Sequence, residues 1–286
     1  MRTVRTVAEL RAALAEPRRA GRRIGLVPTM GALHEGHVSL VDRARSSCDV
    51  VVVTLFVNPA QFDEATDLAA SPRDEARDAR LAAGAGADLL FAPAPEEVYP
   101  PGFATTVTVG GVGATLEGEA RGAVHFAGVA TVVCKLLNMA RPDVAFFGQK
   151  DAQQVAVIRR LVRDLDIPVE IETGATVREP DGLALSSRNA RLRGEERERA
   201  LALRRALDAV RAGAAAGERD PLALAAAGRA AMTAFSVEPE YLALVAPDTF
   251  APVDRVGDEQ VLVAVAARVG GVRLIDNDIL EGGSRP

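Results

Sequence analysis

From Pro28 to His37 the chain reads PTMGALHEGH. A short apolar run, residues 24–27, precedes this stretch, and apolar residues at helical spacing follow it. The pattern predicts a strand, a glycine-containing turn and a helix, which is where α/β folds bind phosphates. A helix start leaves its first N–H groups unpaired and carries partial positive charge, so it stabilises an anion.

Two histidines lie in this turn, three residues apart. On a helix or its first turn, that spacing puts the imidazoles of His34 and His37 on one side. Gly31 and Gly36 would let the backbone approach a ligand closely. One interpretation is that both imidazoles donate to one phosphate. The alternative is that they are exposed or helix-capping residues, and the spacing alone leaves both open.

The composition is that of a globular protein. The chain has 286 residues, 48% of them hydrophobic and 26% charged, and this length is enough for two domains. A net charge of −5, 4% aromatic residues and no Trp argue against a nucleic-acid binder. We expect no membrane partner and a cytoplasmic location, because no apolar run reaches the length of a membrane span. Cys48 and Cys134 lie in apolar helical patterns and are expected to be buried, reduced thiols.

Apolar runs rich in β-branched residues recur through the first half of the chain. Residues 49–57 form a nearly continuous one, which predicts a central parallel strand buried on both faces. Further strands are expected at 88–92, 105–109, 143–147 and 168–171. The expected helices include one from the capping box at Thr6 to Pro17 and one at 127–139, the latter after a flexible glycine loop at 110–118. We therefore predict an α/β fold, a Rossmann-type doubly wound parallel sheet with its ligand at the carboxyl edge.

The sequence changes character after about residue 176. A polar, glycine-containing loop at 181–189 is followed by two helical patterns rich in Ala and Arg, near 195–212 and 222–235. Three short strand-like runs close the chain, at 241–245, 261–266 and 272–275. We predict two domains, residues 1–176 and 177–286, the second a smaller α+β domain.

Polar side chains follow the predicted strands. Asn58 and Gln61 could orient a carboxylate or hydroxyl, or they could satisfy only the backbone of their turn. The segment 148–151 repeats the pattern of strand, glycine turn and helix, now with Lys150 as the cation. With the chain's three histidines (His34, His37 and His125) and with Arg121 and Arg188, Lys150 would form a cationic pocket suited to a triphosphate.

Several common sites are absent from the sequence. It has no P-loop pattern, no serine nucleophile elbow and no set of metal ligands. Phosphate donors and amides without a nucleophile indicate chemistry between a substrate and ATP. The protein then contributes positioning and charge stabilisation.

Six motifs in order resemble one known family. They are PTMGALHxGH, FVNPxQF, HFxGV, FFGxKDxQQ, DGLAxSSRN and the closing LxDN. Together they resemble the pantoate–β-alanine ligases, whereas HxGH alone would indicate only the wider nucleotidylyltransferase superfamily. The resemblance implies that the pantoate carboxylate attacks the α-phosphorus of ATP and releases pyrophosphate. The amine of β-alanine then displaces AMP from the pantoyl-adenylate.

The resemblance also implies a C-terminal lid, a homodimer, Mg²⁺ and a set of site residues. The catalytic residues would be His34, His37, Lys150 and Arg188. The nucleotide would be bound by Gly36, Gly148, Asp151, Val177, Leu185, Ser186 and Ser187. The substrates would be bound by Met30, Asn58, Gln61, His125 and Gln154. No residue is assigned as a direct metal ligand.

The chain departs from the family pattern at three places. Ser71 stands where the family usually has Tyr, Gln149 replaces the usual Glu before Lys150, and the segment from Arg121 to His125 is one residue longer. Two other functions remain open at this point. One is a nucleotidylyltransferase that releases an adenylylated product, and the other is a nucleotide-binding sensor without catalysis.

Overall fold

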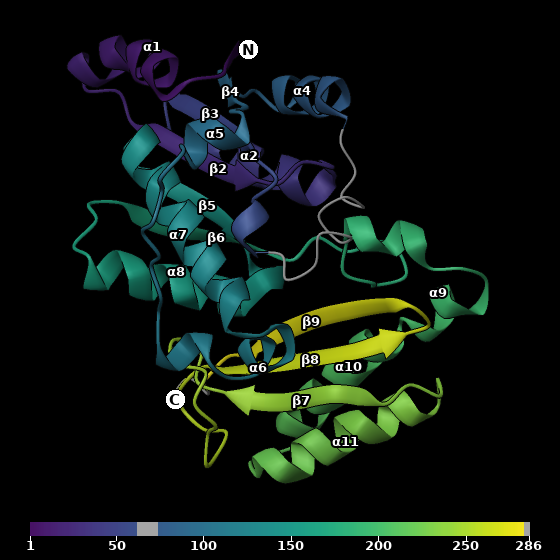
Figure 1. The fold of residues 1–286 in the computed structure, drawn as a ribbon. Coiled ribbons are helices and arrows are strands. Elements are labelled where there is room, and N and C mark those ends of the chain that lie inside the picture. The colour runs from purple at the N-terminus through teal and green to yellow at the C-terminus, as the bar shows by residue number, and fades with distance from the viewer. Residues whose placement is uncertain (62–73, 283–286) are drawn as a thin grey trace. The chain divides into compact units, whose positions relative to one another are not determined.

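A computed structural model describes residues 1–61 and 74–282 (Figure 1). The chain divides into two compact units. The N-terminal unit contains residues 1–148 and 153–175, and the C-terminal unit contains residues 149–152 and everything from 176 onward. Lys150 therefore groups with the C-terminal unit. The roles predicted for the two domains stay predictions, and Ser71 lies outside the described residues.

The N-terminal unit is built on a six-stranded sheet in the order β1-β4-β3-β2-β5-β6, with every pair parallel. The strands are β1 (Arg2–Val4), β2 (Ile24–Thr29), β3 (Val50–Leu55), β4 (Leu89–Phe91), β5 (Val144–Gly148) and β6 (Glu170–Gly174). Three successive valines of β3 are fully buried, as expected for a central strand. The strand order reverses between β2 and β5, which confirms the doubly wound α/β prediction.

The helices of this unit lie between its strands in the chain. They are α1 (Val7–Arg19), α2 (Glu35–Ser47), α4 (Glu75–Gly84), α5 (Pro95–Val98), α6 (Glu117–Arg121), α7 (Ala123–Ala140) and α8 (Ala152–Asp164). Helices α2 and α4 share one apolar cluster with strands β2 to β5. Helix α7 contacts β2 and also α1. The carboxyl ends of β2 and β3 are level, because Thr29 pairs with Leu55.

Some expectations within this unit were wrong. No strand forms at residues 105–109, because this extended, mostly exposed segment has no neighbouring strand among the described residues; the Val107 N–H donates instead to Thr131 Oγ1. The last strand begins at Glu170 rather than Pro168, since proline cannot donate to a ladder. The glycine loop at 110–118 contains a 3-10 turn and the start of α6.

Helix boundaries and cysteines also differ from expectation. Helix α1 continues two residues past Pro17, and α7 starts at Ala123, so His125 lies in its first turn and not in a loop. Cys48 is buried and caps the end of α2, but Cys134 is only half-buried. Both thiols are free, and burial raises the pKa of each. No helix in the described part of the chain has the length and apolarity to cross a membrane, and the cytoplasmic location stays a prediction.

The C-terminal unit has a three-stranded antiparallel sheet in the order β7-β8-β9, which confirms the smaller α+β unit. Its strands are β7 (Pro239–Val245), β8 (Val261–Val269) and β9 (Val272–Leu280). Its helices are α9 (Glu195–Arg199), α10 (Ala202–Ala215) and α11 (Pro221–Thr233), so the single helix expected at 195–212 is in fact two. Apolar residues of α10 and α11 form one core with alternate residues of β8.

Candidate active site

His34 and His37 build the start of helix α2. The His34 Nδ1 accepts the N–H of Gly36 at 3.1 Å, and the His37 Nδ1 accepts the N–H of His34 at 3.3 Å. The two rings form a reciprocal capping box, with centroids 4.2 Å apart. Because each Nδ1 is an acceptor, the neutral ring carries its proton on Nε2. Capping and donation to a phosphate thus use different nitrogens, and the two interpretations left open by the spacing are compatible.

A buried carboxylate shapes the turn before these histidines. Gly31 and Ala32 have φ values of +92° and +50°. Asp78, on α4 and 1% exposed, accepts the N–H groups of Ala32 and Leu33, both at 2.8 Å. Arg77 donates to the Leu33 carbonyl at 2.9 Å. No local pattern in the sequence points to this clamp, because Asp78 lies more than 40 residues away.

Asn58 is saturated by contacts within the protein. Its Nδ2 donates to Gln61 Oε1 at 3.0 Å and to the Gly128 carbonyl at 3.1 Å. Its Oδ1 accepts the N–H of Ala60 at 3.3 Å and the Tyr99 hydroxyl at 2.7 Å. The side chain is 1% exposed. Since all four hydrogen-bonding positions of the amide are occupied, Asn58 orients Gln61 and has no polar group left for a substrate.

Four of the five expected substrate residues lie together in the N-terminal unit. Gln61 Nε2 lies 3.0 Å from the Sδ of Met30, a side chain that is 43% exposed. The His125 Nδ1 lies 3.2 Å from the Gln61 carbonyl oxygen. Asn58 joins this group through Gln61. Gln154 is half-buried in the first turn of α8, and its side chain makes no hydrogen bond to the residues that the structure describes.

The Tyr99 hydroxyl should lose its proton at an unusually high pH. Burial raises the pKa of Tyr99 to about 12 from the ordinary value of 10.0. Because the folded pKa lies above the unfolded one, stability should fall as the pH rises from 10 through 12. A Tyr241→Phe variant leaves Tyr99 as the single phenol, and its absorbance at 295 nm should change with a midpoint near 12. A midpoint near 10 would show that the Tyr99 hydroxyl is not buried, and Tyr99→Phe, which removes the phenol, is the control for the loss of stability.

Arg121 of α6 and Gln153 of α8 make their hydrogen bonds to residues of the N-terminal unit. Arg121 Nε donates to the buried Glu117 carboxylate at 2.8 Å, so its charge is offset and its expected place in the cationic pocket is not supported. Gln153, 4% exposed, was missed by sequence reasoning. It binds the N–H of Glu117 and the carbonyls of Val112 and Thr115, and so orders this loop.

In the C-terminal unit, two of the expected catalytic residues and one expected nucleotide residue line one pocket. They are Lys150, Ser186 and Arg188, and Arg273 of β9, which sequence reasoning missed, lines it too. Lys150 Nζ lies 3.8 Å from Asp151 Oδ1 and the side chain is 17% exposed. Asp276 lines the pocket as well, and Arg273 Nε donates to Glu240 at 2.6 Å, so Lys150 and Arg188 are the candidates to bind an anion.

A short hairpin brings the serines to this pocket. The Leu185 N–H donates to the Val177 carbonyl at 2.9 Å, and Arg178 and Ala184 form an isolated bridge. Ser186 then caps the 3-10 turn Ser187–Arg191, its Oγ accepting the N–H of Arg188 at 3.2 Å. Ser186 therefore fixes the backbone of Arg188, while Ser187 is exposed.

Residues 2–279 match the model of the family described as pantoate-beta-alanine ligase. The chain belongs to the pantoate–β-alanine ligase family. A pantothenate synthetase of Cereibacter sphaeroides is 56% identical over 274 residues, which cover 96% of this chain and 98% of that protein.

Two solved structures of pantoate–β-alanine ligases are similar over almost their full length. The pantothenate synthetase of Thermus thermophilus has a TM-score of 0.90 and 50% identity, and the match covers 97% of this chain and 98% of the other. The pantoate–β-alanine ligase of Francisella tularensis, complexed with beta-gamma ATP and β-alanine, has a TM-score of 0.80 and 31% identity. That match covers 98% of this chain and 97% of the other. The resemblance found in the motifs is thus confirmed over the whole chain.

Proposed function

We propose that this chain condenses pantoate with β-alanine at the expense of ATP, through a pantoyl-adenylate, with release of AMP and pyrophosphate. Membership of the pantoate–β-alanine ligase family supports the overall reaction. The observation that carries the adenylation step is the capping box of His34 and His37. It leaves the proton of each neutral imidazole on Nε2, at the N-terminus of α2.

The two imidazoles would act during attack on the α-phosphorus. Negative charge builds up on the equatorial oxygens and on the leaving pyrophosphate. Fixed donors at a helix start stabilise that charge without reorganisation, because the capping bonds of His34 and His37 already hold the rings. Gly36 adds no side chain to the first turn of α2. An added Cβ there would lie 2.9 Å from the His34 ring.

We assign the remaining contacts unit by unit. In the C-terminal unit, Lys150, Ser186 and Arg188 would hold phosphate oxygens in their shared pocket. We assign the rest of the nucleotide to Gly148, Asp151, Val177, Leu185 and Ser187. In the N-terminal unit, Met30, Gln61, His125 and Gln154 would bind the substrates, with Asn58 fixing the Gln61 amide.

Mg²⁺ would enter with the nucleotide. The described residues contain no group of three or more side chains suited to hold a metal ion. Mg²⁺ is commonly bound by substrate phosphates with one or two carboxylates, and Asp151, whose Oδ1 lies 3.8 Å from Lys150 Nζ, is a candidate carboxylate. The ion would neutralise phosphate charge when bound. The homodimer likewise stays a proposal, which sedimentation equilibrium can test.

The reaction can be tested with the purified protein. ATP and pantoate with Mg²⁺ should support exchange of labelled pyrophosphate into ATP without β-alanine, and pantothenate should appear only when β-alanine is added. AMP release that is indifferent to pantoate would contradict the proposal. A stable adenylylated product that β-alanine does not consume would instead identify a nucleotidylyltransferase. Binding of ATP without any exchange or turnover would identify a sensor.

A further inference from the structure

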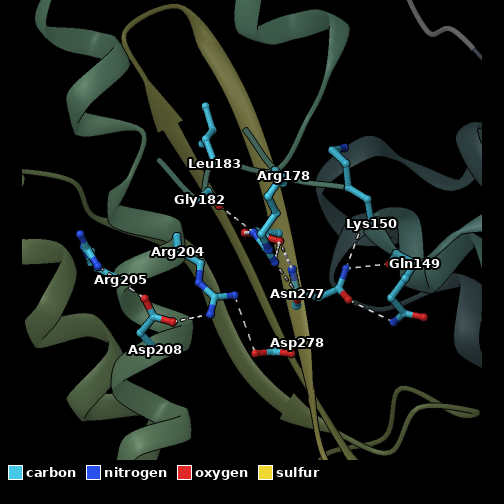
Figure 2. A network of polar contacts seen from close by, with 12 residues as sticks. Gln149, Lys150, Arg178, Gly182, Leu183, Arg204, Arg205, Asp208, Asn277 and Asp278 are labelled. Carbon is cyan, nitrogen blue, oxygen red and sulfur yellow. Dashed lines mark hydrogen bonds and ion pairs between the residues drawn. The ribbon is translucent and has the colours of Figure 1, made fainter. Parts of the chain in front are cut away.

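The closing LxDN motif contains two consecutive buried polar residues in β9. Asp276 is 3% exposed and Asn277 is 5% exposed. Neighbouring residues of a strand point to opposite faces of the sheet, so the two side chains reach different segments. Both segments belong to the C-terminal unit and both carry candidate nucleotide residues (Figure 2). The proposed function assigns no role to this motif.

Asn277 holds the turn that carries Lys150. Its Nδ2 donates to the carbonyl oxygens of Gln149 and Lys150, each at 2.9 Å, and its Oδ1 accepts Gln149 Nε2 at 3.1 Å (Figure 2). The orientation of the amide is forced, because backbone carbonyls can only accept. Residue 149 must then present a donor to Oδ1, which the glutamine of this chain does and a carboxylate could not.

Asp276 holds the hairpin that leads to Ser186. Its carboxylate binds Arg178 in a two-point contact, Nη1 to Oδ2 at 2.6 Å and Nη2 to Oδ1 at 3.0 Å. Arg178 also donates to the Gly182 carbonyl at 3.1 Å (Figure 2). Burial works to lower the pKa of Arg178, but the hydrogen bond and charge of Asp276 outweigh it and the pKa is raised. Arg178 therefore stays charged, and its two-point contact with Asp276 keeps the hairpin in place.

We propose that Asp276 and Asn277 are positioning residues for the nucleotide pocket. From one strand they fix the Lys150 turn and the 178–184 hairpin, so that Lys150, Ser186 and Arg188 line the same pocket. The proposal rests on the proposed function, because it takes this pocket as the site of the ATP phosphates. Without the amide of Asn277, the three-residue turn Gln149–Asp151 loses the side-chain bonds that hold two of its carbonyls.

The test compares Asn277→Asp with a neighbour on the same strand. The substituted side chain has the same shape but sets a carboxylate oxygen against two carbonyls, so the KM for ATP in pantoate-dependent AMP formation should rise roughly 10-fold or more. The control is Asp278→Asn. Asp278 pairs with Arg204 and Arg211 on α10 and, among the described residues, with nothing in the Lys150 turn (Figure 2). Its KM for ATP should stay within about twofold of the parent value.

A double-mutant cycle separates positioning from a general loss of structure. If Asn277 acts through Lys150, then adding Asn277→Asp to Lys150→Ala should raise the KM for ATP by less than about a further twofold. Effects that multiply would overturn the proposal, as would an unchanged KM in Asn277→Asp. Failure of the parent protein to release AMP with ATP, pantoate and β-alanine together would overturn the proposed function instead.

A variant that tests the contact between Asp276 and Arg178 keeps the proposal testable if Asn277→Asp does not fold. Arg178→Lys keeps the positive charge but cannot bind both oxygens of Asp276 at once. We expect its KM for ATP to rise about threefold, with a smaller change in kcat. A KM equal to that of the parent would contradict the role of Asp276.

Discussion

Replacing Lys150 by alanine is expected to lower the turnover number at least about 100-fold, as the loss of a fixed transition-state donor does. Lys150 lines the pocket with Ser186 and Arg188, and its 17% exposure indicates a partly desolvated amine. A cation in that setting stabilises the phosphates of bound ATP and, more strongly, the charge that develops on a leaving pyrophosphate, so both the KM for ATP and the turnover number should depend on it. The measurement is the rate of pantothenate formation at saturating ATP, pantoate and β-alanine.

The chain offers a matched control, since its only other lysine is Lys135. That amine lies over the ring of Phe103, 4.5 Å from the centroid, and is not part of the proposed site. Lys135→Ala should keep turnover within about twofold while losing some stability. His37→Ala should cause a loss similar to Lys150→Ala, and also removes the cap on the His34 N–H. Turnover close to normal in Lys150→Ala would refute its role.

Gly128→Ala is expected to disrupt both stability and pantoate binding. A Cβ at this position of α7 would lie 2.2 Å from the Ala60 carbonyl oxygen and 2.7 Å from the Gln61 Cα, which are backbone atoms. Helix α7 or the turn Pro59–Gln61 must move, and the bond from Asn58 to the Gly128 carbonyl then breaks. Overpacking of this kind costs about 1–3 kcal/mol or more, and the KM for pantoate should rise at least about 10-fold.

Gly84→Ala is the control for this substitution. Gly84 ends helix α4, and an added Cβ there meets no atom within 4 Å. Its free energy of unfolding in urea should be unchanged or slightly higher, since alanine favours the helix. Suppose that Gly128→Ala unfolds at the same urea concentration as the parent and keeps its KM for pantoate. That result would contradict the tight packing of α7 against the turn Pro59–Gln61.

The sequence was sufficient where structure depends on local pattern. The apolar run at 49–57 and the turn before His34 predicted β3, β2 and the start of α2, because strand and helix periodicity are properties of a few consecutive residues. The same reasoning failed at 105–109. Threonine and valine favour a strand, but a strand also needs a partner, and here none of the described strands pairs with the segment.

The parts of the site that the sequence did not predict are held by distant side chains. Asn58 and Gln61 were recognised as a pair, but the bond to Tyr99 and the packing against Gly128 depend on the tertiary fold. The capping of α2 by its own histidines also needed atomic geometry, because spacing cannot distinguish Nδ1 from Nε2. Asp276 and Asn277 were visible only as a motif without a role.

The clamp of Asp78 on Ala32 and Leu33 makes the histidine turn dependent on another helix. A peptide of residues 28–37 has the motif but not the carboxylate that holds two of its N–H groups. If residues 28–37 were placed between a strand and a helix of another protein, the sequence would be unchanged but the turn would not adopt this conformation. Because these bonds join residues more than 40 positions apart, we expect the turn to reach its final form only once α4 has packed against it.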